Sequence, residues 1–453
     1  MPHSTSLRSG PKSTNFRTVC RCWLLALLSL GVTQGLAQTA PKPLPTAEKV
    51  ELMTRIYADV KMYFAHWSAI PKFDLNKEYS AYVQQALQAP DRASFDLATL
   101  HFFAQLHNGH TTFYDSTLWG DEKPAGFSLR KLGETFVVDK SSIENLPEGS
   151  IIRQIAGQPT AAFVSDKLAY VTASSPQAAL HALSWMPYLF PTRFTVTLDD
   201  GKVVPIDRAT QKLRSQPEER VEGKQLEPGV ALIRIPSFND SAYEQEARRL
   251  LKTFREARVL IIDVRGNGGG TSPERLTDDL IGEPWQSFSS VTPMHIGYNE
   301  ALGHIPRSAA GSDEQMKGIL SAFEGSERTE MRFPAIPSKT PAGSQVFGGQ
   351  LLVLSDSFCA SACEDFLGAI KVSKRGTIIG ENSDGTTGQP YMEDFGDGFW
   401  FRVGAKREYL ADGTEFEGVG IVPDIIVSPS LDDLRFARDR VMERAMEAAR
   451  KSK

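Results

Sequence analysis

The segment LLVLSDSFCASACEDFLGAI, residues 351–370, decides the fold predicted for this chain. Its apolar run at 351–354 has the length and composition of a buried strand. From Ala362 onward the pattern becomes helical, with apolar residues at helical spacing at Phe366, Leu367 and Ile370. Ser361 therefore stands at a strand-to-helix turn, where the free N–H groups and positive end of a helix suit a developing oxyanion.

Ser361 also has a purely structural interpretation. Serine is a favoured N-cap residue, and Glu364, three residues later, would complete a capping box. Taken alone, the segment is compatible with a helix cap as well as with a catalytic nucleophile. Other parts of the chain have to decide between the two.

The N-terminus has the pattern of a secretory signal peptide over residues 1–37. Scattered basic residues precede an apolar run at 23–32, and Gly35-Leu36-Ala37 provides a small-residue cleavage site. The apolar run is too short to span a bilayer. We therefore expect cleavage after Ala37 and an exported protein, periplasmic or secreted, with no integral membrane segment after signal removal. The residue directly after the cleavage site is Gln38 and not a cysteine, so lipid attachment is not indicated.

Length and composition limit the number of domains and the classes of binding partner that we expect. With 453 residues, 41% hydrophobic and 23% charged, it can bury a large core and is expected to hold two or three domains. A net charge of -5 offers no electrostatic basis for binding nucleic acid.

Two of the four cysteines lie in the signal peptide, which leaves Cys359 and Cys363 on either side of Ser361. Export to an oxidising compartment would allow a disulfide between them, and two residues four apart on a helix fall within disulfide range. Two buried thiols that pack at a helix start are the alternative.

The first half of the exported chain divides into three parts. Residues 38–46, rich in Pro, Ala and Thr, are expected to form a flexible tail. Apolar stripes at helical spacing predict a helical domain at 47–118, which ends in an Asn-Gly turn. Short strands and turns at 119–210 resemble a PDZ-like module, a class that binds extended peptides by adding a strand to an open sheet edge.

In the second half, residues 211–430, predicted strands and helices alternate as in an α/β core. A strand at 230–235 is followed by a helix at 242–257, a strand at 259–265 and the glycine-rich loop 266–270. That loop lacks both the Walker and the dinucleotide-binding spacing. Residues from about 283 to 350 are predicted to be a long insertion or lid, and an amphipathic helix within 431–453 closes the chain.

Three segments of this core resemble the S41 peptidases, which include the C-terminal processing (tail-specific) proteases and the tricorn-type proteases. DVRGNGG at 263–269 is similar to the family's D-x-R-x-N-x-G loop, SACE at 361–364 to its nucleophile segment, and GIVPD at 420–424 to its late motif. The resemblance implies an α/β fold with a ClpP/crotonase-like peptidase core, a helical N-terminal region and a PDZ-like module. It also favours Ser361 as a nucleophile.

The chain departs from the family at the general base. Processing proteases pair the serine with a lysine in a G-E-x-x-x-G-K segment, whereas Thr386 stands at that position here. A threonine cannot accept the serine proton near neutral pH. The tricorn-like branch uses a histidine and a late glutamate instead. The segment LHNGHT at 106–111 matches its histidine motif and makes His110 the base, with His107 as a rival, and Glu417 takes the place of the glutamate.

The resemblance therefore implies an exported serine endopeptidase that acts on protein or peptide substrates. Ser361 would attack, His110 would take its proton, and Glu417 would orient the histidine directly or through another group. The oxyanion would be bound by the N–H of Ala362 and a glycine N–H from Gly268-Gly269. No metal or other cofactor is implied. The alternatives are a non-catalytic peptide- or lipid-binding protein on the same fold and, by fold analogy alone, an acyl-CoA enzyme of the crotonase type.

Overall fold

The computed structural model describes residues 43–451 except 121–122, 211–218, 287, 324–328, 342, 344 and 397. The predicted signal peptide and the tail up to residue 42 lie outside these residues. No helix among the described residues has the length and apolar character needed to cross a membrane.

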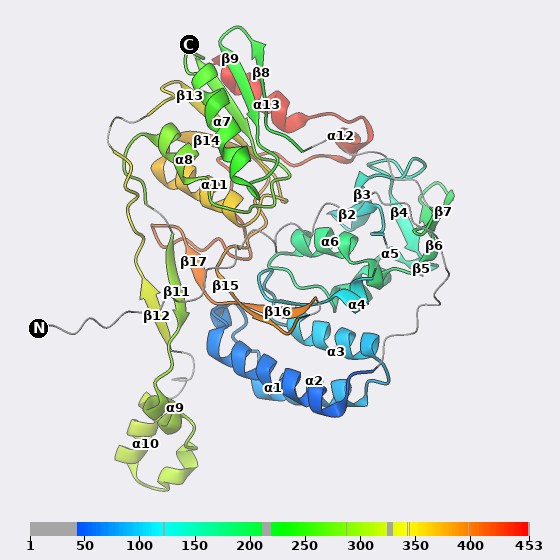
Figure 1. Cartoon of the computed structure of the whole chain (residues 1–453), viewed down its shortest axis with the longest axis vertical. Coiled ribbons are helices and arrows are strands. Elements are labelled where there is room, and N and C mark those ends of the chain that lie inside the picture. Colours follow the sequence, from blue (N-terminus) through cyan, green and yellow to red (C-terminus); the bar gives the residue numbers. More distant parts are fainter. Residues whose placement is uncertain are drawn as a thin grey trace, which may run out of the picture. The chain divides into compact units, whose positions relative to one another are not determined.

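A six-stranded sheet forms the core of the second half of the chain (Figure 1). Five neighbouring strands run parallel, and the edge strand β8 is antiparallel to β9. In spatial order the strands are β18 (Ile425–Ile426), β14 (Gly376–Gly380), β13 (Gln350–Ser355), β10 (Val259–Asp263), β9 (Val230–Arg234) and β8 (Glu222–Glu227). The central strands read as continuous apolar runs because both faces of this sheet are covered.

Helices cover the two faces of this sheet. On one face lie α7 (Ser241–Thr253), α8 (Glu274–Ile281) and α11 (Ala362–Ser373), whose apolar residues share a buried cluster with alternate residues of the strands. On the other face α13 (Arg440–Lys451) packs through Ala445 and Ala449. The strand and helix predicted around Ser361 are thus confirmed as β13 and α11.

The prediction of one continuous helix at the C-terminus, residues 431–453, is wrong. Two helices occur instead, α12 (Leu431–Arg435) and α13. The chain turns between them, where Ala437 adopts a left-handed backbone with φ 49°. A non-glycine residue in that conformation ends a right-handed helix.

The N-terminal region is helical and packs on a three-stranded sheet. Its helices are α1 (Thr46–Tyr63), η2 (Trp67–Ala69), α2 (Leu75–Gln88) and α3 (Arg92–Ala104). The sheet has the order β1 (Thr112–Asp115), β16 (Phe399–Gly404) and β15 (Pro390–Asp394). Phe401 and Val403 of β16 join the apolar cluster of the helices. The antiparallel pairing of β1 with β16 therefore carries the segment around His110 to the late part of the chain.

A second region, from α4 (Ser116–Trp119) to β7, has its own apolar cluster. A hairpin of β2 (Phe127–Leu132) and β3 (Thr135–Ser141) accompanies a sheet of order β5 (Gln158–Pro159), β4 (Ile152–Ile155), β6 (Arg193–Leu198) and β7 (Val203–Asp207). Its helices are α5 (Thr160–Leu168), α6 (Pro176–Trp185) and η3 (Pro187–Leu189). The PDZ-like interpretation of this region stays a prediction.

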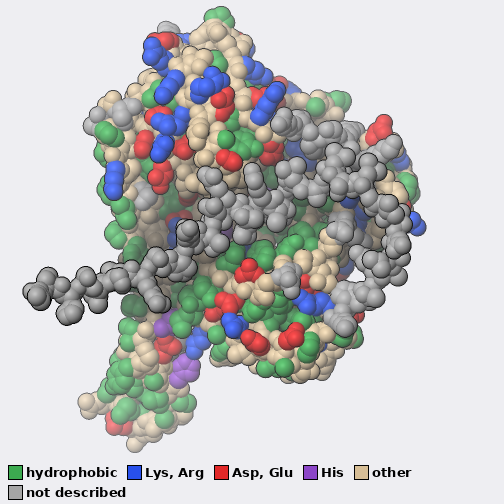
Figure 2. All heavy atoms as spheres, in the orientation of Figure 1, with side chains coloured by type: hydrophobic (Ala, Val, Ile, Leu, Met, Phe, Trp, Pro, Cys, Tyr) green, Lys and Arg blue, Asp and Glu red, His purple; other side chains and the backbone are tan. Residues whose placement is uncertain are grey.

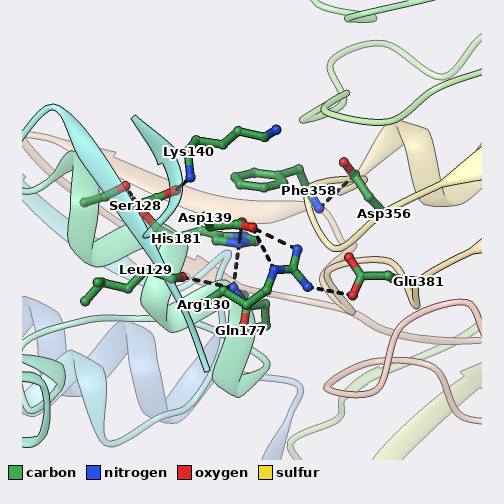
Figure 3. A network of polar contacts seen from close by, with 12 residues as sticks. Ser128, Leu129, Arg130, Asp139, Lys140, Gln177, His181, Asp356, Phe358 and Glu381 are labelled. Atoms are coloured by element: carbon green, nitrogen blue, oxygen red, sulfur yellow. Dashed lines mark hydrogen bonds and ion pairs between the residues drawn. The ribbon is translucent and has the colours of Figure 1, made fainter. Parts of the chain in front are cut away.

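This second region contacts the core beside the nucleophile turn (Figure 3). Arg130 of β2 donates to Asp139 of β3 at 2.7 Å and to Glu381, which follows β14, at 2.6 Å. The ring of His181 on α6 stacks on Phe358 with 3.6 Å between the ring centroids. Phe358 lies three residues before Ser361, so the second region supports the segment that leads into the turn.

Between α8 and β13 the chain makes a long excursion. It contains β11 (Ser289–Pro293), α9 (Gly297–Gly303), η4 (Arg307–Ala310), α10 (Glu314–Ala322) and β12 (Glu330–Phe333), and β11 also pairs with β17 (Arg407–Tyr409). Apolar side chains gather on the α9–α10 lobe, where Tyr298 and Met316 are exposed (Figure 2).

Candidate active site

Ser361 occupies a strained turn between β13 and α11. Its backbone has φ 54° and ψ -123°, whereas an ordinary N-cap residue is extended. Such a conformation costs a non-glycine residue about 1–3 kcal/mol and persists only where neighbouring contacts impose it. Two acceptors hold the Ser361 N–H: the Thr386 carbonyl at 3.0 Å and the Glu364 carboxylate at 3.2 Å. The contact with Glu364 belongs to the capping box that the sequence suggested, and the positive φ distinguishes Ser361 from an ordinary N-cap residue.

Glu364 ties this turn to the loop after β14. Its fully buried carboxylate accepts hydrogen bonds from the Ser383 hydroxyl and from the N–H groups of Gly385 and Thr386, both at 2.8 Å. Burial raises the pKa of Glu364 to about 8. Glu364 thus holds Ser361 and Thr386 in fixed relation to each other.

The glycine-rich loop lies against the nucleophile turn because β10 and β13 are parallel neighbours, whose carboxyl ends meet at one edge of the sheet. A methyl group on Gly269 would lie 2.5 Å from the Ala360 carbonyl oxygen and 2.9 Å from the Ser361 Cβ. The backbone of Gly269 also has φ 92°. Only glycine lets this loop approach so closely.

The two predicted glycine donors differ in their availability. The Gly269 N–H already donates to the Asn267 side chain at 2.9 Å. Gly268 is exposed, and its N–H has no recorded partner among the described residues. The N–H of Ala362, the first residue of α11, likewise has none there. Of the predicted donors, Gly268 and Ala362 therefore keep N–H groups without a recorded partner among the described residues, while Gly269 allows the close approach.

His110 reaches the same turn through Thr386. Its Nδ1 lies 2.9 Å from the Thr386 hydroxyl, and the carbonyl of that threonine accepts the Ser361 N–H. No contact recorded among the described residues joins the Ser361 hydroxyl to the His110 ring directly. Burial, together with the charges of Arg402 and Lys406, lowers the pKa of His110 to about 3. The imidazole is therefore neutral at neutral pH and able to accept a proton.

His107 differs from His110 in both position and backbone. It is exposed, with φ 47°, in the turn that follows α3. No hydrogen bond to the nucleophile turn is recorded for its side chain among the described residues.

Glu417 is buried, and no contact between it and His110 is recorded among the described residues. One carboxylate oxygen accepts from the Glu408 N–H at 3.2 Å and lies 3.4 Å from the Thr387 hydroxyl. The other lies 3.7 Å from Nδ1 of His66. Whether Glu417 orients the histidine directly or through another group stays a prediction.

His66 is a buried residue that sequence reasoning missed. Asn108 accepts the His110 N–H at 3.1 Å and the Thr111 hydroxyl at 2.8 Å on its side-chain oxygen, so its NH₂ group faces His66 Nε2 at 3.2 Å. Nε2 must then accept, which leaves the proton on Nδ1, the nitrogen nearest Glu417. Asn108 therefore links His66 to the backbone of His110, whereas the Glu417 oxygen near Nδ1, at 3.7 Å, has no hydrogen-bond partner among the described residues. No sequence motif marks His66, because Asn108 lies 42 residues away.

Cys359 and Cys363 are free thiols, which corrects the disulfide considered above. The helix begins only at Ala362, so Cys359 lies in the preceding turn and the helical spacing assumed for the pair does not apply. Both thiols are buried and directed at the Val264 carbonyl, at 3.1 Å from Cys359 and 3.9 Å from Cys363. Burial raises the pKa of both. They are packing residues under the nucleophile turn.

Across the residues that the structure describes, no three His, Cys, Asp or Glu side chains come together as a metal site would require.

Part of the chain is similar to known proteins. The model of peptidase family S41 matches residues 229–427. A chloroplastic C-terminal processing peptidase from Tetradesmus obliquus is 25% identical over 212 residues, which cover 46% of this chain and 38% of that protein. A carboxy-terminal-processing protease from Bartonella bacilliformis is 30% identical over 118 residues, 26% of each chain. The chain thus spans well under half the length of these relatives.

Among solved structures, mature CPAF complexed with lactacystin superposes with a TM-score of 0.64 at 13% identity, over 89% of this chain and 97% of that one. At that identity the likeness shows the fold alone. It shows that the mixed α/β architecture extends beyond the segment matched by the family model. The nucleophile turn, the glycine loop and the late motif all lie inside residues 229–427, the segment of this chain that matches peptidase family S41.

Proposed function

We propose that the chain is an exported serine endopeptidase that hydrolyses protein or peptide substrates, with Ser361 as nucleophile and His110 as general base. The observation that carries the proposal is the double contact of Thr386, whose carbonyl holds the Ser361 N–H while its hydroxyl meets His110 Nδ1. Thr386 stands where the serine-lysine branch of the family has its lysine. A histidine directed at that position supplies the base that the threonine cannot.

The proton path follows from the ring contacts. With Nδ1–H donating to the Thr386 hydroxyl, Nε2 of His110 is the nitrogen left to accept a proton. Ser361 Oγ attacks the scissile carbonyl while Nε2 takes its proton, and the ring then passes that proton to the leaving amine. Water hydrolyses the acyl-enzyme with the same histidine acting as base. Apo contacts between nucleophile and base are often loose and tighten on substrate binding.

The remaining roles follow from the surroundings. The N–H groups of Ala362 and Gly268 bind the oxyanion at the positive end of α11. Glu417 acts through His66 and Asn108, which fix the backbone of His110, and is a positioning residue. His107, exposed and without a recorded contact to the turn, has no part in the reaction.

Export rests on the predicted signal peptide at 1–37. The ClpP/crotonase-like description of the core and the PDZ-like description of the second region belong to the same proposal. A peptide- or lipid-binding protein without catalysis is the alternative. A binding protein would not need a strained serine linked through Thr386 to a neutral histidine, nor two N–H donors without a recorded partner among the described residues.

Covalent labelling tests the proposal directly. Incubation of the signal-free protein with a fluorophosphonate should attach one phosphonyl group, as Ser361 Oγ attacks phosphorus and fluoride leaves. Peptide mapping should place the added mass on residue 361, and heat-denatured protein should not react. Intact folded protein that stays unlabelled would favour the binding-protein alternative.

The glycine loop offers a matched pair of variants. Gly269→Ala should lower kcat/KM for peptide hydrolysis by about 10²-fold or more, because the new methyl group would displace the Ser361 turn and such misplacement has effects of that size. Gly268→Ala should cost far less, since a methyl group there meets no atom within 4 Å. Melting temperatures separate misplacement from unfolding. Equal activity of the two variants would contradict the assigned geometry.

Thr386 should set the tautomer of the base. Thr386→Val removes the acceptor for His110 Nδ1–H and should lower kcat by about 10- to 100-fold, part of the full contribution of a general base. Thr386→Ser keeps the hydroxyl and should restore most of the activity. The comparison is made by the rate of single-turnover phosphonylation with a fluorophosphonate, which reports attack by Ser361 without turnover. Equal rates for the valine and serine variants would show that the hydroxyl has no role.

A further inference from the structure

Arg402 lies on β16 next to the proposed base. It pairs in register with Thr112 of β1 and Met392 of β15. Its neighbours Phe401 and Val403 enter the apolar core, so Arg402 lies on the opposite face of this sheet. Met392 on that face is 49% exposed, which leaves the face open to solvent near Arg402.

The Arg402 guanidinium makes few hydrogen bonds among the described residues. One N–H donates to the Gly109 carbonyl at 3.2 Å, while Nε is buried without a hydrogen-bond partner. Across the described residues no salt bridge to Arg402 is recorded. The neighbouring cations differ: Lys406 pairs with Glu408 at 2.6 Å, and Arg407 lies 3.7 Å from Glu415. Arg402 is thus a largely enclosed positive charge without an acidic partner.

Such a charge is unfavourable in the empty site. Removing a cation from water is unfavourable unless an anion or good hydrogen bonds compensate. Arg402 also disfavours protonation of His110, as seen in the lowered pKa of that ring. If the Arg402 side chain only had to donate a hydrogen bond to the Gly109 carbonyl, a neutral donor would be sufficient. The position therefore calls for an anion that arrives from outside the protein.

We propose that Arg402 binds a carboxylate of the substrate next to the scissile bond. A planar guanidinium can bind a carboxylate through two parallel hydrogen bonds. On the same sheet face, Tyr114 and Trp400 stack with 5.1 Å between ring centroids and offer an aromatic surface beside the charge. The proposal names the substrate class of the proposed peptidase and rests on that function.

Binding of the carboxylate would also strengthen the base. Arg402 lowers the pKa of His110 while its charge is uncompensated. A bound carboxylate offsets that charge and raises the pKa of the ring toward its ordinary value. A substrate with the carboxylate in place would therefore be cleaved faster as well as bound more tightly.

The test is cleavage of two proteome-derived peptide libraries, one with free and one with amidated C-termini, read by mass spectrometry. The wild-type protein should cut bonds flanked by Asp or Glu about 10- to 100-fold more efficiently than bonds with Asn or Gln there, as expected for a desolvated charge pair. If the carboxylate is a chain terminus, the preference should be for bonds near a free C-terminus and disappear on amidation. Arg402→Gln should bring either preference close to 1.

Lys406→Gln is the matched control, because it removes the other cation that acts on His110 but one already paired with Glu408. It should keep the preference, whereas a general electrostatic effect on the base would change both variants alike. Each preference is a ratio within one variant, so altered basicity of His110 cancels. Cleavage without a carboxylate preference, or a preference that survives in Arg402→Gln, would overturn the inference and leave the proposed function standing. Libraries that stay uncut would instead overturn the proposed function and this inference with it.

Discussion

Ser361→Ala is expected to lower kcat/KM for peptide hydrolysis by about 10⁴-fold or more, in line with the removal of a nucleophile from other serine peptidases. The loss should be confined to chemistry, because the side chain is only partly buried and the turn is held by backbone contacts to Thr386 and Glu364. The melting temperature should stay close to that of the wild type. Peptide turnover and thermal unfolding, measured on the same preparation, check both statements.

Ser357→Ala provides the control for this variant. Ser357 lies four residues earlier in the same segment, and its buried hydroxyl has no hydrogen-bond partner recorded in the described chain. Loss of that hydroxyl should leave turnover within a few-fold of the wild type, since no interaction is broken. Turnover near the wild-type rate in a clean Ser361→Ala preparation would show that the nucleophile lies elsewhere.

His110→Ala should reduce kcat/KM almost as far as Ser361→Ala does, since residues that act as one unit have similar single effects. The matched variant is His107→Asn, which removes the rival imidazole but keeps a residue type that tolerates the left-handed backbone at that position. It should retain activity within a few-fold. Steady-state kinetics on a single peptide substrate compare the two, and the reverse ranking would transfer the base role to His107.

The pH profile gives an independent measure of the same residue. Protonation inactivates a base below its pKa, and that of His110 is lowered to about 3. The acid limb of kcat/KM should therefore lie well below pH 5, whereas an unperturbed histidine would place it near pH 6.5. The folded pKa is below the unfolded value, so His110 contributes stability above about pH 6.5 that is lost as the pH falls toward 3. An acid limb at pH 6–7 would contradict the neutral, enclosed ring.

Local sequence patterns were sufficient for the elements that carry the nucleophile. The apolar run at 351–354 became β13, and the helical spacing after Ala362 became α11. The strands predicted at 230–235 and 259–265 became β9 and β10, and the helix between them became α7. These predictions hold because a fully buried strand and a helix face are encoded by the spacing of neighbouring residues. The interruption between α12 and α13 was not predicted, because alanine rarely adopts the left-handed backbone that Ala437 has here.

By itself, the sequence determined the family segments, the serine at the strand-to-helix turn and the absence of the usual lysine at position 386. Tertiary structure alone decided what surrounds them. It showed that Thr386 contacts both Ser361 and His110, and that a carboxylate oxygen of Glu417 lies 3.7 Å from Nδ1 of His66. It also left Arg402 without an acidic partner among the described residues. The arrangements of Thr386 and Glu417 involve segments that are distant in the chain and are brought together by sheet pairing such as β1 with β16. No local spacing of residues encodes such pairing.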